Sequence, residues 1–331
     1  MRIAGPLAAC AVVAGLIGAG AQPALAAGST GTAVRTVAVR TVAVRADTGA
    51  ASAPAGVRAR LAEQANLTTG TVVWSRSSAT ERPMGSITKV MTAYLVIEAG
   101  DLNRVITVPK GIVAYDDKFG ASTAGLRPGE KLTALQLLYA MLLPSGCDAA
   151  YALAAAYGPG TAAFIAKMNS MAGTLRLTKT HFSDFSGLPD PTEYSTYSTA
   201  RDLVSLGRDA MKLKVFRQIV ATRTYKLAKT ATHPKFTWQN LNPLLGRYPG
   251  AIGIKTGFTS AAGDCLLFAA EHGKQVLIGV VLDSSSSPSG LNVAAADATA
   301  MLNWGLSRLP AAGPPRRAAG SFRLSAGSGR R

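Results

Sequence analysis

Cysteine and histidine are scarce in this chain of 331 residues, which has three of each. Cys10 lies in the N-terminal apolar run and is expected to leave with it, so Cys147 and Cys265 remain and allow at most one disulfide. A protein held together by a disulfide framework is thereby excluded. The histidines lie far apart and in no metal-ligand spacing, so the sequence predicts no metal site and no cofactor.

Acidic residues are also few, since 18 Asp and Glu stand against 35 Lys and Arg, a formal net charge of +17. The N-terminus, residues 27–60 and the C-terminal tail together carry +10 of this charge, which leaves about +7 for the central part. No recognition helix, zinc motif or aromatic-basic module accompanies the charge, so nucleic acid is not predicted as a partner. An anionic cell-wall polymer or membrane surface suits the basic tail better, and simple solubility explains it equally well.

After the first 26 residues no apolar run reaches the ~18 residues of a membrane span. Met1-Arg2, an Ala/Gly-rich apolar run and the small-residue pattern at 24–26 indicate a signal peptide, residues 1–26, cleaved near Ala26. A lipoprotein signal ending at Cys10 fits less well because the apolar run continues past it, and an uncleaved anchor fits the small-residue site less well. We therefore expect an exported, extracytoplasmic protein of the cell wall or medium.

Composition divides the rest of the chain into three segments. Residues 27–60 read as a basic flexible linker in which the sequence TVAVR occurs twice in succession, at 36–40 and 41–45; a strand is the alternative. Residues 61–309 are long enough for one sizeable core and are predicted to form the folded domain. Residues 310–331, rich in Gly, Ser and Arg, read as a disordered basic tail.

Within the central segment, the pattern predicts strands at 71–75, 252–257, 264–270 and 275–283, with helices in between and at 291–306, which indicates a mixed α/β fold. Ser86 and Lys89 open one apolar helical run, at a spacing that places both side chains on one face. Free backbone N–H groups at the start of such a helix favour negative charge. This arrangement of Ser86 and Lys89 favours a nucleophile with its base, and two residues of a solvated helix surface are the alternative.

Two further polar elements follow. Ser145 is expected on a tight turn, because the helical run 132–143 stops at Pro144 and a new helix begins after Gly146; an N-cap role is the alternative. In residues 251–259, isoleucine alternates with glycine as in a strand, and Ile254 before Lys255 excludes a phosphate-binding loop. Lys255 and Thr256 would then line a strand edge suited to an extended peptide that ends in a carboxylate.

The three elements, S-x-x-K at 86–89, S-G-C at 145–147 and K-T-G at 255–257, resemble the motif set of penicillin-binding proteins and serine β-lactamases. The chain more closely resembles the low-molecular-mass D-alanyl-D-alanine carboxypeptidases, peptidase family S11. This resemblance covers about residues 67–305 and is carried by the segments 71–75, 82–89, 126–130, 185–190 and 253–259.

The resemblance implies an α/β (α+β) fold of the penicillin-binding type, an antiparallel sheet flanked by helices with an additional helical cluster. It also implies a serine carboxypeptidase, or transpeptidase, that trims peptidoglycan stem peptides ending in D-Ala-D-Ala during cell-wall biogenesis and in maintaining cell shape, and that β-lactams inhibit. It assigns catalysis to Ser86, Lys89 and Ser145, and substrate binding to Lys255, Thr256, Gly257, Phe258, Thr259 and Cys147.

Each role that the resemblance implies has a chemical basis. Ser86 would attack the penultimate carbonyl, Ser145 would relay a proton to the leaving amine, and the backbone N–H groups of Ser86 and Phe258 would form the oxyanion hole. A lysine acts as a base only if its pKa falls from ~10.4, which desolvation and a neighbouring cation would produce. Lys255 and Thr256 would hold the substrate carboxylate.

Two positions depart from the family pattern. Cys147 replaces the usual Asn, which would contact the acyl-side amide of the substrate, and we expect its thiol to be accessible at the cleft mouth. The Ser-rich segment 284–290 lacks the Arg that often binds the carboxylate, so binding must rest on Lys255, Thr256 and Thr259. The alternatives are a class A-like β-lactamase, for which the expected E-x-x-L-N element is missing, and a non-catalytic cell-wall-binding protein on the same fold.

Overall fold

The structure is a computed structural model that describes residues 53–287 and 291–308. The predicted signal peptide, residues 27–52 of the predicted linker and the basic tail lie outside these residues, so those assignments stay predictions.

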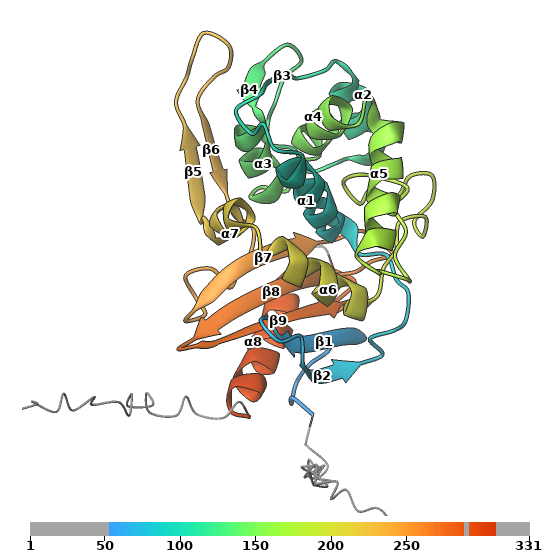
Figure 1. The fold of residues 1–331 in the computed structure, drawn as a ribbon, viewed down its shortest axis with the longest axis vertical. Coiled ribbons are helices and arrows are strands. Elements are labelled where there is room, and N and C mark those ends of the chain that lie inside the picture. Colours follow the sequence, from blue (N-terminus) through green and yellow to red (C-terminus); the bar gives the residue numbers. More distant parts are fainter. Residues whose placement is uncertain (1–52, 288–290, 309–331) are drawn as a thin grey trace, which may run out of the picture. The chain divides into compact units, whose positions relative to one another are not determined.

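A five-stranded sheet forms one part of the fold (Figure 1). Every neighbouring pair in it is antiparallel. Its spatial order is β2 (Val72–Arg76), β1 (Leu61–Asn66), β9 (Gln275–Leu282), β8 (Cys265–His272) and β7 (Ala251–Gly257). The strand that carries the K-T-G motif is therefore an edge strand, and an edge strand has free backbone groups that can pair with an extended ligand.

Helices form the other part (Figure 1). They are α1 (Lys89–Ala99), α2 (Gly111–Phe119), α3 (Ala134–Leu142), α4 (Cys147–Tyr157), α5 (Thr161–Thr174), α6 (Ala200–Ala210), α7 (Lys214–Ala221) and α8 (Leu291–Leu306). A short 3-10 turn, η1 (Gly85–Thr88), precedes α1. Two small ribbons complete the fold, β3 (Val105–Thr107) with β4 (Lys131–Thr133), and β5 (Thr224–Leu227) with β6 (Phe236–Gln239).

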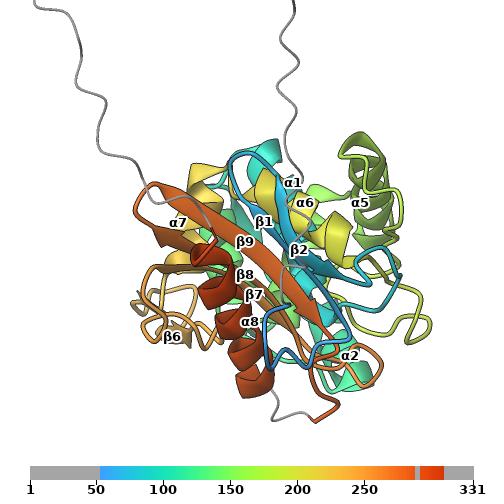
Figure 2. The ribbon, with the colours of Figure 1, turned by 90° about the horizontal axis from the view of Figure 1, so that it is seen from below.

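Strands β8 and β9 are apolar on both faces because helices cover both. Successive side chains of a strand point to opposite faces. Accordingly Leu267 and Ile278 belong to the core cluster that includes the helical part, whereas Phe268 and Leu277 belong to a second cluster with α8. Figure 2 shows α8 lying across one face of the sheet, with α6 on the other.

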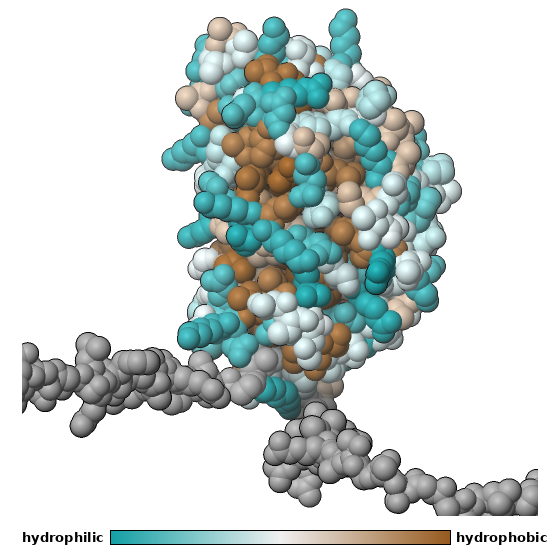
Figure 3. Space-filling model, in the orientation of Figure 1, coloured by the Kyte–Doolittle hydropathy of each residue, from teal (hydrophilic) through white to brown (hydrophobic). Residues whose placement is uncertain are grey.

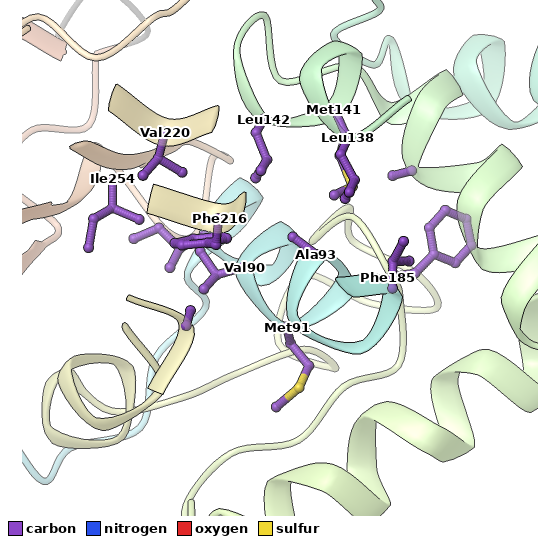
Figure 4. Packing of buried hydrophobic residues seen from close by; sticks show 14 of the residues in the cluster. Val90, Met91, Ala93, Leu138, Met141, Leu142, Phe185, Phe216, Val220 and Ile254 are labelled. Atoms are coloured by element: carbon purple, nitrogen blue, oxygen red, sulfur yellow. The ribbon is translucent and has the colours of Figure 1, made fainter. Parts of the chain in front are cut away.

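Helix α1 runs through the middle of the larger core cluster. Figure 4 shows Val90, Met91 and Ala93 of α1 among side chains from several other elements. These neighbours are Leu138, Met141 and Leu142 of α3, Phe216 and Val220 of α7, Ile254 of β7, and Phe185. Burial of its first five residues fixes the start of α1 relative to β7 and to the turn that follows α3.

The predicted strands at 71–75, 252–257, 264–270 and 275–283 and the helix at 291–306 are confirmed within one or two residues as β2, β7, β8, β9 and α8. Strand β1 was not predicted, because its sequence LAEQAN carries Glu63 and Gln64, both buried here. The fold also begins before residue 61, because Val57 and Ala59 are buried and the backbone N–H of Ala59 donates to Asp297 Oδ2 at 2.8 Å. The predicted linker boundary is therefore a few residues too late.

Hydrophilic residues cover much of the face drawn in Figure 3, with hydrophobic residues in separate patches between them. Within residues 53–287 and 291–308, no single helix is long and apolar enough to cross a membrane, and only α4 with α5, a pair bent by 86°, passes that test together.

Candidate active site

Ser86 and Lys89 meet at the start of α1. Ser86 lies in the 3-10 turn η1 and Lys89 is the first residue of α1, so the two do not share one regular helix as predicted, although their side chains do meet. Lys89 is fully buried, and its Nζ donates to Ser86 Oγ at 2.8 Å. It also donates to the Ser186 carbonyl at 3.0 Å and to Cys147 Sγ at 3.3 Å.

Ser145 and Lys255 form a second pair. Ser145 lies on the predicted tight turn between α3 and α4, in a left-handed conformation with a φ of 66°. Lys255 Nζ donates to Ser145 Oγ at 3.0 Å and to the Thr256 carbonyl at 3.0 Å. Burial, and then the charge of Lys89, hold the pKa of Lys255 well below its usual range.

Two glycines let β7 lie against the turn that carries Ser86. Gly85 has a φ of +53°, and a side chain on it would come within 2.7 Å of the backbone nitrogen of Phe258. A side chain on Gly257 would collide with the carbonyl of Met84. The backbone of Phe258 thereby lies beside Gly85, the residue that directly precedes Ser86.

The Ser145 turn is tied to the loop before β4. The backbone N–H of Cys147 donates to the Ser122 carbonyl, and Ser122 Oγ donates to the Ser145 carbonyl, both at 2.8 Å. The buried carboxylate of Asp148 accepts from the backbone N–H groups of Ala124 and Leu126, and burial raises its pKa. These bonds hold Ser122 beside Ser145 and Cys147.

Sequence reasoning missed Asp184, which supports Lys89 from behind. Its Oδ1 accepts from the backbone N–H groups of residues 186, 187 and 188 at 2.6–2.9 Å, and Tyr115 donates to its Oδ2 at 2.6 Å. The segment held in this way presents the Ser186 carbonyl to Lys89. The only signal in the sequence is that Asp184 directly precedes the segment 185–190.

A cleft of about 420 Å³ opens beside these groups. Six of the nine predicted site residues line it: Ser86, Ser145, Thr256, Gly257, Phe258 and Thr259. Lys89 and Lys255 lie behind the cleft wall, with exposed fractions of 0% and 1%, and act on the cleft through the hydroxyl groups they contact.

The prediction that the Cys147 thiol is accessible at the cleft mouth is wrong. Its side chain is 1% exposed and does not line the cleft; its sulfur contacts Lys89 instead. The thiol is turned inwards because Cys147 is the first residue of α4, which packs in the helical core. Cys147 and Cys265 are both buried and free, so the structure has no disulfide between them.

The comparisons with known proteins agree with this geometry. The family model described as D-alanyl-D-alanine carboxypeptidase matches residues 48–286. A D-alanyl-D-alanine carboxypeptidase of Streptomyces sp. (strain K15) is 43% identical over 253 residues, which are 72% of this chain and 84% of that protein. One from Mycobacterium tuberculosis is 38% identical over 218 residues, 65% of this chain and 71% of that protein.

Solved structures are similar to this protein as well. The crystal structure of the Streptomyces K15 DD-transpeptidase superposes with a TM-score of 0.71 at 40% identity, covering 76% of this chain and 98% of that one. A D-alanyl-D-alanine carboxypeptidase from Mycobacterium tuberculosis gives 0.68 at 34% identity, covering 76% of this chain and 92% of that one. Motifs, fold and relatives converge, and the chain belongs to the D-alanyl-D-alanine carboxypeptidase family of serine peptidases, family S11.

Proposed function

We propose that this protein is an exported serine-type D-Ala-D-Ala carboxypeptidase, able to act as a transpeptidase, on peptidoglycan stem peptides. The observation that carries the proposal is the 2.8 Å contact between Lys89 Nζ and Ser86 Oγ. Lys89 is fully buried, and none of the ion pairs recorded for residues 53–287 and 291–308 includes it. A lysine in this setting suits the task of a base.

In the first step, Lys89 removes the proton of Ser86 while Ser86 Oγ bonds to the carbonyl carbon of the penultimate D-alanine. The carbonyl oxygen becomes an oxyanion, which the backbone N–H groups of Ser86 and Phe258 stabilise by about 3 kcal/mol per donor in well-studied enzymes. The intermediate collapses when the bond to the leaving nitrogen breaks. Ser145, in contact with Lys255, relays to this nitrogen the proton that Lys89 took from Ser86, so that Lys89 can act as a base again in the second step.

In the second step, water or an amine attacks the ester on Ser86, and the proton it loses returns to Ser86 Oγ through Lys89. Water completes hydrolysis, and an amine completes transpeptidation. Lys255 and Thr256 bind the terminal carboxylate of the substrate. A carboxylate that arrives beside Lys255 favours its charged form, so binding of the substrate offsets the low pKa that burial gives this lysine.

The N-terminal and C-terminal segments extend the proposal. An apolar N-terminal segment of signal-peptide type supports export to the cell wall or medium, where the stem peptides are found. The basic tail, with five arginines in residues 310–331, suits an anionic cell-wall polymer or membrane surface. Localising the full chain and a version that ends at residue 309 would test both points.

The enzymatic proposal is tested with a diacyl-D-Ala-D-Ala peptide and with a labelled penicillin. The wild type should release D-alanine and form a long-lived penicillin ester, whereas Ser86→Ala should do neither and still fold. Ser170→Ala, which removes an exposed hydroxyl from α5, is the matched control and should behave as the wild type. Residual labelling of Ser86→Ala would overturn the assignment, and rapid penicillin turnover would favour a β-lactamase.

A further inference from the structure

A second cavity, of about 540 Å³, adjoins the catalytic cleft. Leu241 and Leu291 line both cavities and form the boundary between them. Arg223, at the start of the β5–β6 hairpin, and Arg247, before β7, line the second cavity, and no acidic residue does. The cavity therefore carries two positive charges next to the site of reaction.

These two arginines lack an anionic partner in the part of the chain that the structure describes, where no recorded ion pair includes either. Both are exposed. The guanidinium of Arg223 lies against the backbone of Gly246, where a side chain would come within 2.7 Å of its Cζ. It lies at the cavity without a recorded ion-pair partner among the described residues.

Asn242 gives an independent indication of a ligand that accepts hydrogen bonds. It lines the same cavity and is only 4% exposed. The backbone N–H of Leu244 donates to its Oδ1 at 3.0 Å, which fixes the orientation of the amide. Its Nδ2 has no partner among the described residues. A buried donor without an acceptor is costly, and an anion in the cavity would supply one.

The cavity lies on the leaving-group side of the reaction. The backbone N–H of Leu241 donates to the Leu143 carbonyl at 3.1 Å, two residues before Ser145, and Ser145 contacts Lys255. Lys255 and Ser145 are the groups that handle the terminal carboxylate and the leaving amine. By microscopic reversibility, an acceptor amine approaches the acyl-enzyme from the side where the leaving amine departed.

Building on the proposed function, we propose that the cavity lined by Arg223 and Arg247 is an acceptor subsite for transpeptidation. It binds the free carboxylate of a peptide whose amine attacks the Ser86 ester. The new C–N bond forms as the bond from carbon to Ser86 Oγ breaks, and the proton lost by the amine passes to Ser86 Oγ. The carboxylate of a single D-alanine lies at Lys255. A longer acceptor extends past Leu241, and its carboxylate lies at the two arginines.

The test compares two acceptors, glycylglycine and glycylglycinamide, which differ in the charge of the far end. With a diacyl-D-Ala-D-Ala donor at low salt, the wild type should prefer glycylglycine by about threefold to tenfold, as expected for a charge-assisted contact at a partly exposed site. In Arg223→Gln combined with Arg247→Gln, the preference should fall below about twofold. Arg127→Gln, at an exposed arginine outside both cavities, should keep it.

Penicillin acylation of Ser86 and release of D-alanine are measured alongside and should be unchanged in the double variant. These two readouts report on the proposed function alone. The subsite is overturned if the wild type shows penicillin acylation and D-alanine release but has no preference between the two acceptors. It is also overturned if the wild type shows these two activities but neither acceptor is used and neither slows the reaction. A double variant that keeps the full preference overturns it as well.

Discussion

The two lysines of the active site occupy similar positions and different electrostatic surroundings. Both are buried, and each donates a hydrogen bond to a serine: Lys89 to Ser86 of its own motif, and Lys255 to Ser145 of the S-G-C motif. Lys89 lies in the field of two carboxylates, Asp116 and Asp148, whereas the charged group that acts most strongly on Lys255 is Lys89 itself. Among the described residues, Lys89 is thus influenced by two acidic residues without forming an ion pair with either, whereas Lys255 is influenced most by another lysine.

From this difference we expect the two lysines to have different tasks. In the proposed mechanism Lys89 exchanges its proton with Ser86 in every cycle and needs a fixed position, which the Ser186 carbonyl and Cys147 supply. No ion pair recorded within residues 53–287 and 291–308 includes Lys255, and in the proposed mechanism the substrate brings a carboxylate to it. If the substrate's carboxylate supplies the negative charge next to this lysine, the site selects substrates that carry a free carboxylate.

The largest effect is expected from Lys89→Ala. Because Ser86 and Lys89 act as a unit, this variant should lose D-alanine release by at least about a thousandfold, nearly as much as Ser86→Ala. Single-turnover acylation by penicillin is the direct measurement. If Lys89→Ala kept more than about a tenth of the activity, Ser145 with Lys255 would have to be the main base.

A smaller and more selective loss is expected from Lys255→Ala, in the range of about 1.5–3 kcal/mol of binding to the substrate carboxylate. Amidating the C-terminus of the peptide should cost the wild type heavily and the variant little. Equal penalties in both proteins would show that Lys255 does not read the carboxylate.

The low pKa of Lys255 sharpens this experiment. Since a bound carboxylate raises the pKa of Lys255 from its lowered position, binding of the acid peptide by Ser86→Ala should take up more protons than binding of the amide. Calorimetry in two buffers with different ionisation enthalpies measures the uptake.

Asp184→Asn probes the support on the Lys89 side. The amide keeps an oxygen for the backbone N–H groups of 186–188 but cannot accept the Tyr115 hydroxyl at its nitrogen. The Ser186 carbonyl should shift relative to Lys89, so kcat should fall by about tenfold. KM for the peptide should stay within about twofold, because Lys255 and Thr256 are untouched. A change confined to KM would contradict the positioning role.

The three motifs were recognisable in the sequence because each lies within a few consecutive residues. Ser86 with Lys89, the Ser145 turn and the Lys255 strand each carry a local signal of helix, turn or strand. The groups that support them are separated in sequence and meet only in the fold. Asp184 reaches Lys89 through the carbonyl of residue 186, and Asn242 gave no motif at all.

Burial was the least predictable property. Cys147 follows Ser145 by two residues, so the motif alone placed it in the cleft, yet the first turn of α4 directs its sulfur to Lys89. Strand β1 was missed for a related reason, since Glu63 and Gln64 read as surface residues and are buried by neighbouring elements. In both cases tertiary packing overrides the local pattern.

The smallest expected effect concerns Asp116 and the negative charge near Lys89. Burial, and then the charges of Asp148 and Asp117, raise the pKa of Asp116 to about 7, and its Oδ1 is buried without a partner in the described part of the chain. Between about pH 4 and pH 7 the folded protein therefore holds a proton that the unfolded chain releases, so the free energy of unfolding falls as the pH rises through this window.

An asparagine at position 116 cannot ionise. Asp116→Asn should therefore match the wild type at pH 4 and exceed it by about 1 kcal/mol at pH 8.5 in urea unfolding, a value reduced from the full linkage because the side chain is only partly buried. Glu98→Gln, which removes an exposed charge from α1, should show no such pH dependence. Equal stabilisation of Asp116→Asn at both pH values would mean that Asp116 does not titrate in this range.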